Sequence, residues 1–231
     1  MAPLKNRRHL FFDLDDTLWD FEKNSTSVLK ELFNEFDLHK KINANFEDFY
    51  IGYSKINISL WKDYQNKKID KLFLRNSRFY LALKKFGYDA FKESQLMNEQ
   101  YLLRSPKGKH LKNDCKNVLD YLYQNYSLHI ISNGFKDVQH TKIDGCGLRP
   151  YFKNIIISEE YQLTKPDEKI FRLAEFFAGT SKENCVMIGD NFDCDMQGAL
   201  NAGWETVYFS EKEHGFKCTS VKRLLDLKAL F

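Results

Sequence analysis

A short apolar stretch that ends abruptly in aspartates constrains this chain more than any other feature. Residues 9–21 read HLFFDLDDTLWDF, so the apolar run LFF is followed at once by Asp13, Asp15 and Asp16. An apolar run bounded in this way predicts a buried strand. Burying carboxylates beside apolar side chains costs several kcal/mol each unless a cation meets them. A hard divalent cation at the end of the strand is the partner that such oxygens favour.

The spacing of these aspartates indicates a division of chemical roles. Asp13 and Asp15 are two residues apart, so their side chains share a face of an extended backbone. Asp16 and Thr17 favour a turn directly afterwards. One carboxylate can then act as a nucleophile while the other transfers protons. Taken alone, the stretch is equally compatible with an acidic turn after a buried strand.

Length and composition restrict the class of protein. With 231 residues, the chain can form one domain with an insertion or two small domains. Hydrophobic residues make up 43% and charged residues 29%, which is typical of a globular protein. The net charge of +3, without a clustered basic face, gives no reason to expect a nucleic acid polymer as partner.

Targeting segments and cysteine usage favour a cytoplasmic protein. No apolar run approaches the ~20 residues of a membrane span, and Met1–Arg8 lacks the apolar core of a secretory signal. The five cysteines are odd in number and scattered without a CxxC pair, which argues against both a disulfide framework and a zinc site. We therefore expect a reducing compartment and no membrane association.

Short apolar runs alternate with stretches long enough for one helix. The predicted strands are His9–Asp13, Leu128–Ser132, Asn154–Ser158, Cys185–Gly189 and Glu205–Phe209. The predicted crossover helices are Lys136–Cys146, Pro166–Ala178 and Cys194–Ala202, the second beginning at its proline and the third ending before Gly203. This alternation predicts an α/β fold with a doubly wound parallel sheet.

One long interval, Leu18–Ser105, contains no comparable strand. Its apolar and aromatic residues recur at helical spacing, as in Val28, Leu29, Leu32 and Phe33. We therefore expect a core domain of residues 1–17 and 106–231 and an inserted all-helical cap subdomain of residues 18–105. Because the insertion leaves directly after the acidic turn, we expect it over the strand ends, where ligands bind in open α/β sheets.

Three further polar stretches are predicted near the ends of strands. They are Ser132-Asn133-Gly134, Lys165 just ahead of a predicted helix, and Asp190 with Asp195 after a buried strand. Each alone is compatible with an ordinary turn or a solvated charge. Together with the first stretch, they supply the carboxylates, cation and oxyanion donors that phosphoryl transfer needs.

These four stretches resemble, in order and separation, the four motifs of the haloacid-dehalogenase-like (HAD) superfamily of phosphatases. The resemblance implies that Asp13 is the nucleophile and that Asp15 is the acid/base. It implies that Asp13, the backbone carbonyl of Asp15 and Asp190 hold Mg²⁺, with Asp195 orienting that site. Residues implied to contact phosphoryl oxygens are Ser132, the Asn133 amide and Lys165, so Lys165 counts among the catalytic residues.

A finer resemblance is to the bacterial pyrimidine 5′-nucleotidases. It is carried by DLDDTLWDF, the stretch LWKDYQNKKI at residues 60–69, Arg78-Phe79, ISNGF, GLRPYF and ISEEYQLTKPDEKIF. The implied substrate is a small phosphate monoester, a pyrimidine nucleoside monophosphate. In the cap, the aromatic candidates to stack on a base are Trp61, Tyr64 and Phe79. Arg75 or Arg78 would meet polar groups, and Phe135 is a further substrate candidate.

Several alternatives share parts of this pattern. A sugar-phosphate or phosphoglycolate phosphatase, or a phosphomutase, would use the same core motifs. A haloacid dehalogenase has no use for Asp15 as acid/base or for a metal, so Asp15 and Asp190 argue against it. A phospho-accepting signalling module of the response-regulator type lacks a large cap, so residues 18–105 argue against that reading.

Overall fold

Six parallel strands form the centre of the larger unit in the computed structural model, which describes residues 8–211, 215, 216 and 218–231. The strands are β1 (His9–Phe12), β2 (Ser127–Ser132), β3 (Phe152–Ile157), β4 (Cys185–Gly189), β5 (Glu205–Phe209) and β6 (Ser220–Val221). Their order in the sheet is β3-β2-β1-β4-β5-β6, and every neighbouring pair is parallel. Residues 1–7, where we expect no secretory signal, lie outside the described residues.

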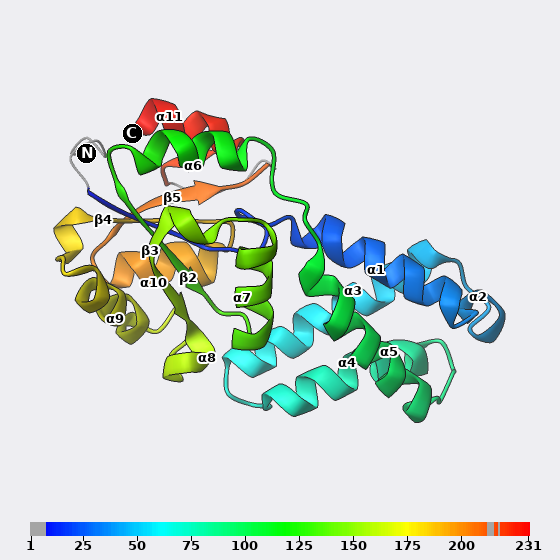
Figure 1. Cartoon of the computed structure of the whole chain (residues 1–231). Coiled ribbons are helices and arrows are strands. Elements are labelled where there is room, and N and C mark those ends of the chain that lie inside the picture. Colours follow the sequence, from blue (N-terminus) through cyan, green and yellow to red (C-terminus); the bar gives the residue numbers. More distant parts are fainter. Residues whose placement is uncertain (1–7, 212–214, 217) are drawn as a thin grey trace. The chain divides into compact units, whose positions relative to one another are not determined.

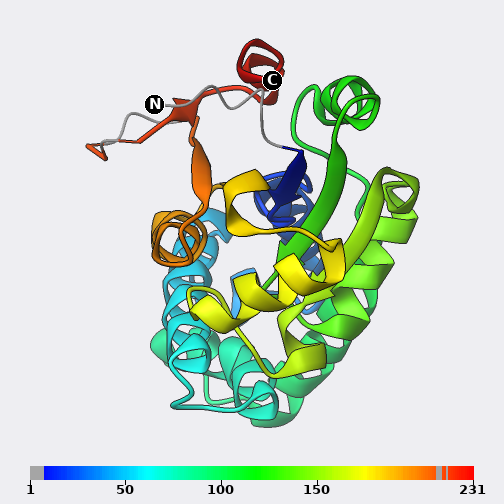
Figure 2. The same cartoon turned by 90° about the vertical axis from the view of Figure 1, so that its left-hand side faces the viewer.

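Helices cover both faces of this sheet. They are α6 (Cys115–Tyr123), α7 (Lys136–Gly145), α8 (Ser158–Tyr161), α9 (Glu168–Ala178), α10 (Gly198–Asn201) and α11 (Leu227–Leu230), with the π-helical turn η5 (Phe192–Gln197) and the short 3-10 turns η3 (Arg149–Tyr151), η4 (Lys182–Asn184) and η6 (Leu224–Asp226). Successive residues of β1 face opposite ways, as a strand requires. Leu10 and Phe12 pack in the core with α6, and Phe11 packs in the core with α9 and α10. Figure 1 shows α6 and α9 on opposite sides of the sheet, and α11 lies beside α6 in Figure 1 and Figure 2.

This architecture confirms the predicted fold class, and all five predicted strands are present. The sequence analysis missed β6, which is only two residues long, and α6. It also placed one helix start too early. Helix α9 begins at Glu168 rather than at Pro166, because the side chain of Asp167 caps it by accepting a hydrogen bond from the Lys169 N–H at 3.0 Å.

The second unit, Glu22–Gly108, is helical and has its own apolar core. Its helices are α1 (Phe21–Glu35, whose first residue belongs to the sheet unit), α2 (Leu38–Lys41), α3 (Phe46–Gln65), α4 (Lys71–Lys85) and α5 (Phe91–Arg104), followed by the 3-10 turn η2 (Ser105–Lys107). Asn45 and Asp70 cap α3 and α4 with their side chains. Among the described residues, no helix has the length and apolarity that crossing a membrane requires.

The units divide at 21/22 and 108/109, whereas we predicted boundaries at 17/18 and 105/106. Trp19 explains the first difference, because it forms backbone bridges to Asp15 and to Leu111 of the sheet unit. The Asp20 N–H also donates to the carbonyl of His110 at 3.0 Å. These hydrogen bonds keep the segment after the acidic turn within the sheet unit.

One buried histidine on β2 has a structural role that depends on pH. The ring of His129 stacks on Phe11 with centroids 4.5 Å apart, and its Nδ1 accepts a hydrogen bond from Asn154 Nδ2 at 3.0 Å. Burial, followed by the charges of His9 and Lys153, lowers the pKa of His129 from 6.5 to about 3. The side chain is therefore neutral in the folded protein at pH values where an exposed histidine is charged.

We expect this histidine to destabilise the protein in mild acid. As the pH falls below about 6.5, the unfolded chain takes up a proton at His129 and the folded protein does not, so the free energy of unfolding falls by up to about 1.4 kcal/mol per pH unit. In urea titrations at pH 7.5, 6.5 and 5.5, His129→Gln should show a flatter pH dependence than the wild type. The exposed His39, changed in His39→Gln, provides the control. Equal slopes for the wild type and both variants would contradict the expectation.

Candidate active site

The carboxyl ends of the parallel strands bring the predicted motifs to one edge of the sheet. Strand β1 lies between β2 and β4, and the chain winds outward from it in both directions. Such a reversal of strand order is where open α/β sheets bind ligands. The Asp13 N–H donates to the Ile188 carbonyl at 2.9 Å, so the end of β1 is fixed against the end of β4. This contact places Asp13 beside Asp190, which directly follows β4.

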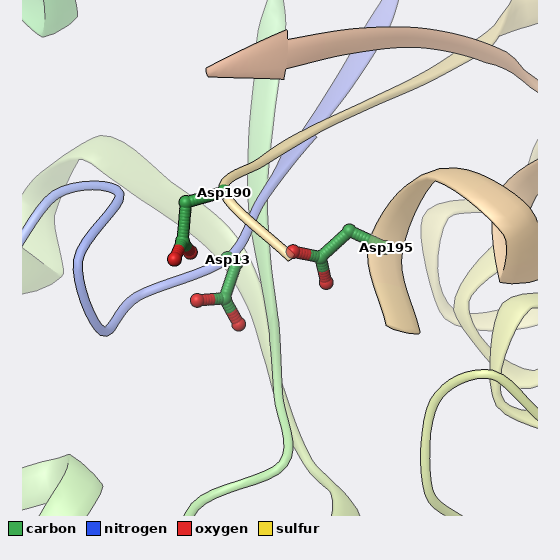
Figure 3. A group of neighbouring side chains, drawn as sticks. All are labelled: Asp13, Asp190 and Asp195. Carbon is green, nitrogen blue, oxygen red and sulfur yellow. The ribbon is translucent and has the colours of Figure 1, made fainter. Parts of the chain in front are cut away.

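Three carboxylates converge at this edge, from Asp13, Asp190 and Asp195 (Figure 3). One oxygen of each lies within 4.8 Å of the others. The Thr17 hydroxyl donates to Asp190 Oδ1 at 3.0 Å, which orients that carboxylate. Sequence analysis gave Thr17 a turn-forming role only, so this contact is new. A cluster of carboxylate oxygens is the donor set that hard divalent cations prefer.

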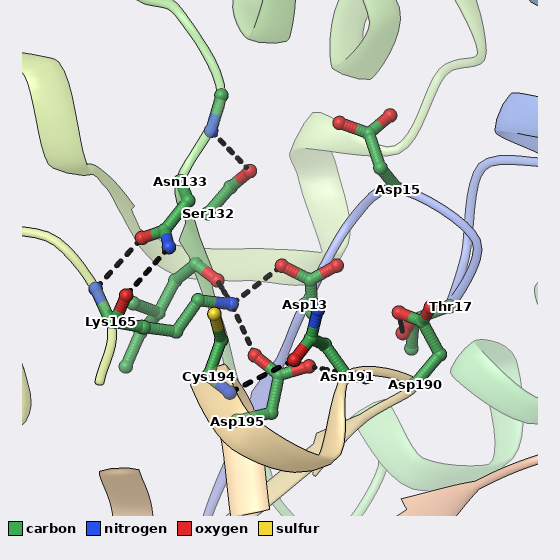
Figure 4. A network of polar contacts seen from close by, with 12 residues as sticks. Asp13, Asp15, Thr17, Ser132, Asn133, Lys165, Asp190, Asn191, Cys194 and Asp195 are labelled. Atoms are coloured by element: carbon green, nitrogen blue, oxygen red, sulfur yellow. Dashed lines mark hydrogen bonds and ion pairs between the residues drawn. The ribbon is translucent and has the colours of Figure 1, made fainter. Parts of the chain in front are cut away.

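Lys165 is the positive centre of the cluster (Figure 4). Only 1% of its surface is exposed, and its ammonium donates to Asp13 Oδ1 at 2.6 Å, to Asp195 Oδ1 at 2.6 Å and to the Ile131 carbonyl at 2.8 Å. An ammonium has three donors, and all three are used here. Lys165 is therefore not a solvated surface charge. Any contact with a phosphoryl oxygen has to replace one of these bonds.

The protonation of the cluster reflects its burial. Burial raises the pKa of Asp13 well above its ordinary value, Lys165 opposes this rise, and the charges of Asp195 and Asp190 add to it. Burial and the charges of Asp195 and Asp16 raise the pKa of Asp190 to about 7. Burial acts to lower the pKa of Lys165, but the attraction of Asp13 and Asp195 outweighs it and keeps that pKa above its ordinary value. The cluster therefore carries more negative charge than the ammonium of Lys165 balances. When no other cation is bound, protons on Asp13 and Asp190 offset this excess.

Asp195 reaches the cluster through a close approach to Gly189. A Cβ atom at position 189 would lie 2.2 Å from Asp195 Oδ2, so only glycine fits. The Asn191 N–H donates to Asp195 Oδ2 at 3.1 Å, and the Asn191 side chain caps η5 by accepting from the Cys194 N–H at 2.9 Å. Both Asp195 oxygens thus already accept hydrogen bonds from the protein. This arrangement suits a residue that orients the site more than one that supplies a ligand atom.

Ser132 and Asn133 occupy the end of β2, but their side chains do different things. The Asn133 side chain makes two reciprocal bonds of 2.8 Å with the backbone of Lys165, accepting from its N–H and donating to its carbonyl. This side chain therefore holds the Lys165 loop. If Asn133 contacts a phosphoryl oxygen, we expect its backbone N–H to make that contact. The Ser132 hydroxyl oxygen accepts from the Gly134 N–H at 3.3 Å.

Asp15 lies apart from the three-carboxylate cluster and meets two residues that the sequence analysis missed. Lys142 Nζ donates to Asp15 Oδ1 at 2.6 Å, and Gln139 Nε2 donates to Asp15 Oδ2 at 2.8 Å. Both are buried residues on α7. A signal was present in the sequence, because they share the face of this helix that Ile143 buries, and a buried helix face seldom carries Gln and Lys.

The helical unit contains the predicted cap residues, which differ in their positions. Phe79 is fully buried, with its ring centroid 4.9 Å from that of Tyr53, so it is a core residue with no surface for stacking on a base. Arg78 is also buried. It donates twice to Asn98 Oδ1, at 2.9 and 3.1 Å, and lies 4.5 Å above the ring of Tyr101. The stacking role expected of Phe79 is therefore wrong, whereas the substrate role expected of Arg78 stays a prediction.

The other substrate candidates are Trp61, Tyr64 and Phe135, which differ in exposure. Trp61 and Tyr64 lie partly exposed on α3, with ring centroids 5.7 Å apart and planes nearly perpendicular. In the sheet unit, Phe135 is buried and immediately precedes α7. The substrate roles of Trp61, Tyr64 and Phe135 stay predictions.

Comparisons with known proteins give one family and several close relatives. Residues 8–203 match the family described as haloacid dehalogenase-like hydrolase. The chain is 34% identical over 205 residues to the pyrimidine 5′-nucleotidase PynA of Streptococcus pneumoniae, covering 88% of this chain and 84% of that protein. It is 31% identical over 243 residues to the N-acylneuraminate-9-phosphatase of Rattus norvegicus, covering 98% and 94%.

The fold is also similar to a solved structure. The crystal structure of the HAD-hydrolase YfnB from Bacillus subtilis bound to magnesium superposes with a TM-score of 0.88. The two sequences are 27% identical, and the match covers 97% of this chain and 98% of that one. The similarity therefore extends over both the sheet unit and the helical unit.

Proposed function

The chain belongs to the haloacid dehalogenase-like hydrolases, and from this membership we propose that it is a magnesium-dependent 5′-nucleotidase acting on pyrimidine nucleoside monophosphates. In this proposal the reaction passes through an aspartyl-phosphate on Asp13. The observation that carries it is the meeting of Asp13, Asp190 and Asp195 around the buried ammonium of Lys165. Buried carboxylates with a purely structural role are normally paired with an equal number of cations, whereas these three carboxylates share one ammonium.

The donor set fits a divalent cation. When ionised, three carboxylates and one ammonium leave two negative charges, which one Mg²⁺ balances. We expect Asp13, the backbone carbonyl of Asp15 and Asp190 to hold it, with Asp195 kept by Lys165 and the Asn191 N–H in an orienting position. Mg²⁺ binding to the related YfnB supports this assignment. When bound, the ion offsets the charge of the carboxylates and of the phosphoryl group.

The residues of the chain divide the work of hydrolysis. A carboxylate oxygen of Asp13 attacks phosphorus and forms the new P–O bond, while the P–O bond to the nucleoside breaks. As Asp13 loses its charge in the acyl phosphate, a Lys165 N–H that faced Asp13 Oδ1 becomes free to donate to a phosphoryl oxygen. Asp15 gives its proton to the departing alcohol and later takes one from the water that hydrolyses the intermediate.

We expect the affinity for Mg²⁺ to fall in acid. The pKa of Asp190 is about 7 and that of Asp13 is raised, so binding the cation has to displace protons from them. For one displaced proton, the apparent affinity drops about tenfold per pH unit below pH 7. Isothermal titration of MgCl₂ at pH 8, 7 and 6, in buffers of different ionisation enthalpy, measures both the affinity and the protons released. A pH-independent affinity with no proton release would remove these carboxylates from the metal site.

The substrate assignment rests on the similarity to PynA, and a substrate panel tests it. The measurement is kcat/KM for phosphate release with Mg²⁺ from UMP, dUMP, dTMP, AMP, GMP, phosphoglycolate and several sugar phosphates. We expect pyrimidine monophosphates to lead by at least about tenfold, a difference of about 1.4 kcal/mol in transition-state binding. A lead by purine nucleotides or by phosphoglycolate would contradict the pyrimidine assignment and leave the core chemistry in place.

A second candidate is a sugar-phosphate phosphatase, favoured by the 31% identity to the rat N-acylneuraminate-9-phosphatase. N-acylneuraminate 9-phosphate therefore belongs in the panel. Trp61→Ala separates the two readings. The partly exposed Trp61 is a candidate to stack on a base. Its loss should raise KM for UMP and leave hydrolysis of sugar phosphates nearly unchanged.

A further inference from the structure

We propose that Gln139 and Lys142 of α7 are positioning residues that hold the Asp15 carboxylate in place for proton transfer to the leaving alcohol. The inference rests on the proposed function, in which Asp15 is the acid/base. It concerns two residues that have no part in the four sequence motifs. Four observations within the sheet unit carry it, and they involve the contacts of Asp15, the packing of Gln139, the hydroxyl of Ser132 and the separation of Asp15 from Asp13.

Both oxygens of the Asp15 carboxylate are held by donors from one helix. Lys142 holds Oδ1 at 2.6 Å and Gln139 holds Oδ2 at 2.8 Å. The Lys142 side chain is 5% exposed, and its Nζ lies 4.4 Å above the ring of Trp19, the residue that closes the turn after Asp15. An ammonium held between a carboxylate and an aromatic ring has few alternative positions. With one donor on each oxygen, both from fixed positions on α7, the orientation of the carboxylate plane is determined. A single donor would leave the carboxylate free to rotate.

Gln139 is packed in a place that only a glycine neighbour permits. A Cβ atom at Gly134 would lie 2.3 Å from Gln139 Cδ and Nε2. Gln139 is fully buried, and its Oε1 has no hydrogen-bond partner among the residues that the structure describes. An unpaired buried acceptor costs about 1 to 3 kcal/mol. A leucine would avoid this cost but would lose both hydrogen bonds of Nε2, so the glutamine is best explained by the groups that its Nε2 holds.

Gln139 also joins Asp15 to the predicted phosphate-binding hydroxyl. Its Nε2 donates to Ser132 Oγ at 2.5 Å, and the Gly134 N–H donates to the same oxygen at 3.3 Å. With two donors on its oxygen, the Ser132 hydroxyl has its own hydrogen left to donate. A phosphoryl oxygen is the acceptor that the proposed function supplies. One amide group thereby sets the direction of a proton donor and of a phosphate donor together.

The separation of Asp15 from Asp13 agrees with in-line displacement. In that geometry the leaving oxygen lies on the side of phosphorus opposite the nucleophile. Figure 4 shows Asp15 away from the group formed by Asp13, Lys165 and Asp195. Asp13 forms its bond to phosphorus while the bond to the alcohol oxygen breaks, and the proton of Asp15 passes to that oxygen. The group that protonates the alcohol therefore has to be held independently of Asp13, and α7 provides this hold.

Gln139→Leu and Lys142→Met test the proposal by separating two leaving groups. An alkyl phosphate such as UMP needs a proton on its departing alcohol, whereas 4-nitrophenyl phosphate releases a stable phenolate. We expect each variant to lower kcat for UMP by about 10- to 100-fold with KM nearly unchanged. The first-turnover burst of nitrophenolate should change by less than about threefold. Lys142→Arg keeps the charge and should recover part of the rate.

Two controls distinguish positioning from general damage. Lys136→Met makes the same exchange on an exposed part of α7, where Lys136 pairs with Glu160, and should leave all rates unchanged. Free energies of unfolding should show Gln139→Leu within about 1 kcal/mol of the wild type, because removing the unpaired Oε1 offsets the loss of the Nε2 hydrogen bonds. In a double-mutant cycle, Lys142→Met should cost little when Asp15 is already Asn, because the two changes remove the same function.

The outcomes separate failure of this inference from failure of the proposed function. Equal losses on UMP and 4-nitrophenyl phosphate, no loss on either, or additive effects with Asp15→Asn would overturn the positioning role while leaving the hydrolase intact. If the wild type hydrolyses sugar phosphates but not UMP, the best alkyl phosphate replaces UMP and the same comparison decides. A wild type that releases phosphate from none of them overturns the proposed function and this inference with it.

Discussion

Asp13→Asn is expected to lower kcat by about 10⁴- to 10⁶-fold, because an amide oxygen does not form the phosphorylated intermediate. The change is nearly isosteric, and Asn Oδ1 can still accept the hydrogen bond that Lys165 now gives to Asp13. The loss should therefore appear in the chemistry and not in the fold. Acid-quenched reactions with a ³²P-labelled monoester measure the phosphoenzyme directly, and none should form in the variant.

Asp144→Asn is the matched control for this experiment. Asp144 is an exposed carboxylate of α7 that pairs with Arg149, away from the three-carboxylate cluster. Its replacement should change neither the rate nor phosphoenzyme formation. If Asp13→Asn turns over at the wild-type rate, the nucleophile is a different group and the assignment of the first motif is wrong.

Lys165→Met is expected to lower the free energy of unfolding by about 3 to 5 kcal/mol in the absence of divalent cation, and to abolish activity. The substitution leaves the carboxylates of Asp13 and Asp195 buried without their shared cation. The loss should be smaller at pH 5 than at pH 8. Burial already raises the pKa of Asp13, so protonation of this carboxylate at the lower pH removes one of the unbalanced charges. Adding Mg²⁺ should recover part of the stability, because the ion supplies positive charge.

Urea titrations of the wild type and Lys165→Met, with and without MgCl₂ at both pH values, measure these differences. Lys136→Met is the control here too, since Lys136 forms an exposed pair at 3.1 Å and pairs of that kind contribute about 0 to 1 kcal/mol. A destabilisation by Lys165→Met no larger than that of Lys136→Met would mean that the buried carboxylates do not need the ammonium.

The parts of the fold and site that the sequence predicted are those with a strong local pattern. The strands β1, β2, β4 and β5 are apolar runs covered on both faces, and such runs are recognisable without knowledge of the neighbouring strands. Asp13 and Asp190 follow directly on β1 and β4, so the parallel topology alone brings them to one edge. For these residues, the position along the chain was sufficient.

The parts that were missed depend on partners distant in sequence. Gln139 and Lys142 are separated from Asp15 by 124 and 127 positions, and only the packing of α7 on the turn after β1 reveals their contacts. Arg78 and Phe79 were predicted as substrate residues because they belong to a stretch that resembles the nucleotidases. The packing of α3, α4 and α5 instead buries both side chains within the helical unit. Helical periodicity shows which residues share a face, but it does not show what that face covers.

The position of Lys165 also has a consequence for how the chain folds. Asp13 and Lys165 are separated by 152 positions, yet their carboxylate and ammonium form a buried ion pair at 2.6 Å. A partly folded chain in which β1 has joined the sheet without the Lys165 loop would contain a buried carboxylate with no counter-charge. Such a species has a high free energy and is poorly populated. The residues proposed for catalysis therefore make the assembly of the sheet more cooperative, since β1 gains its full stability only when the Lys165 loop between α8 and α9 is in place.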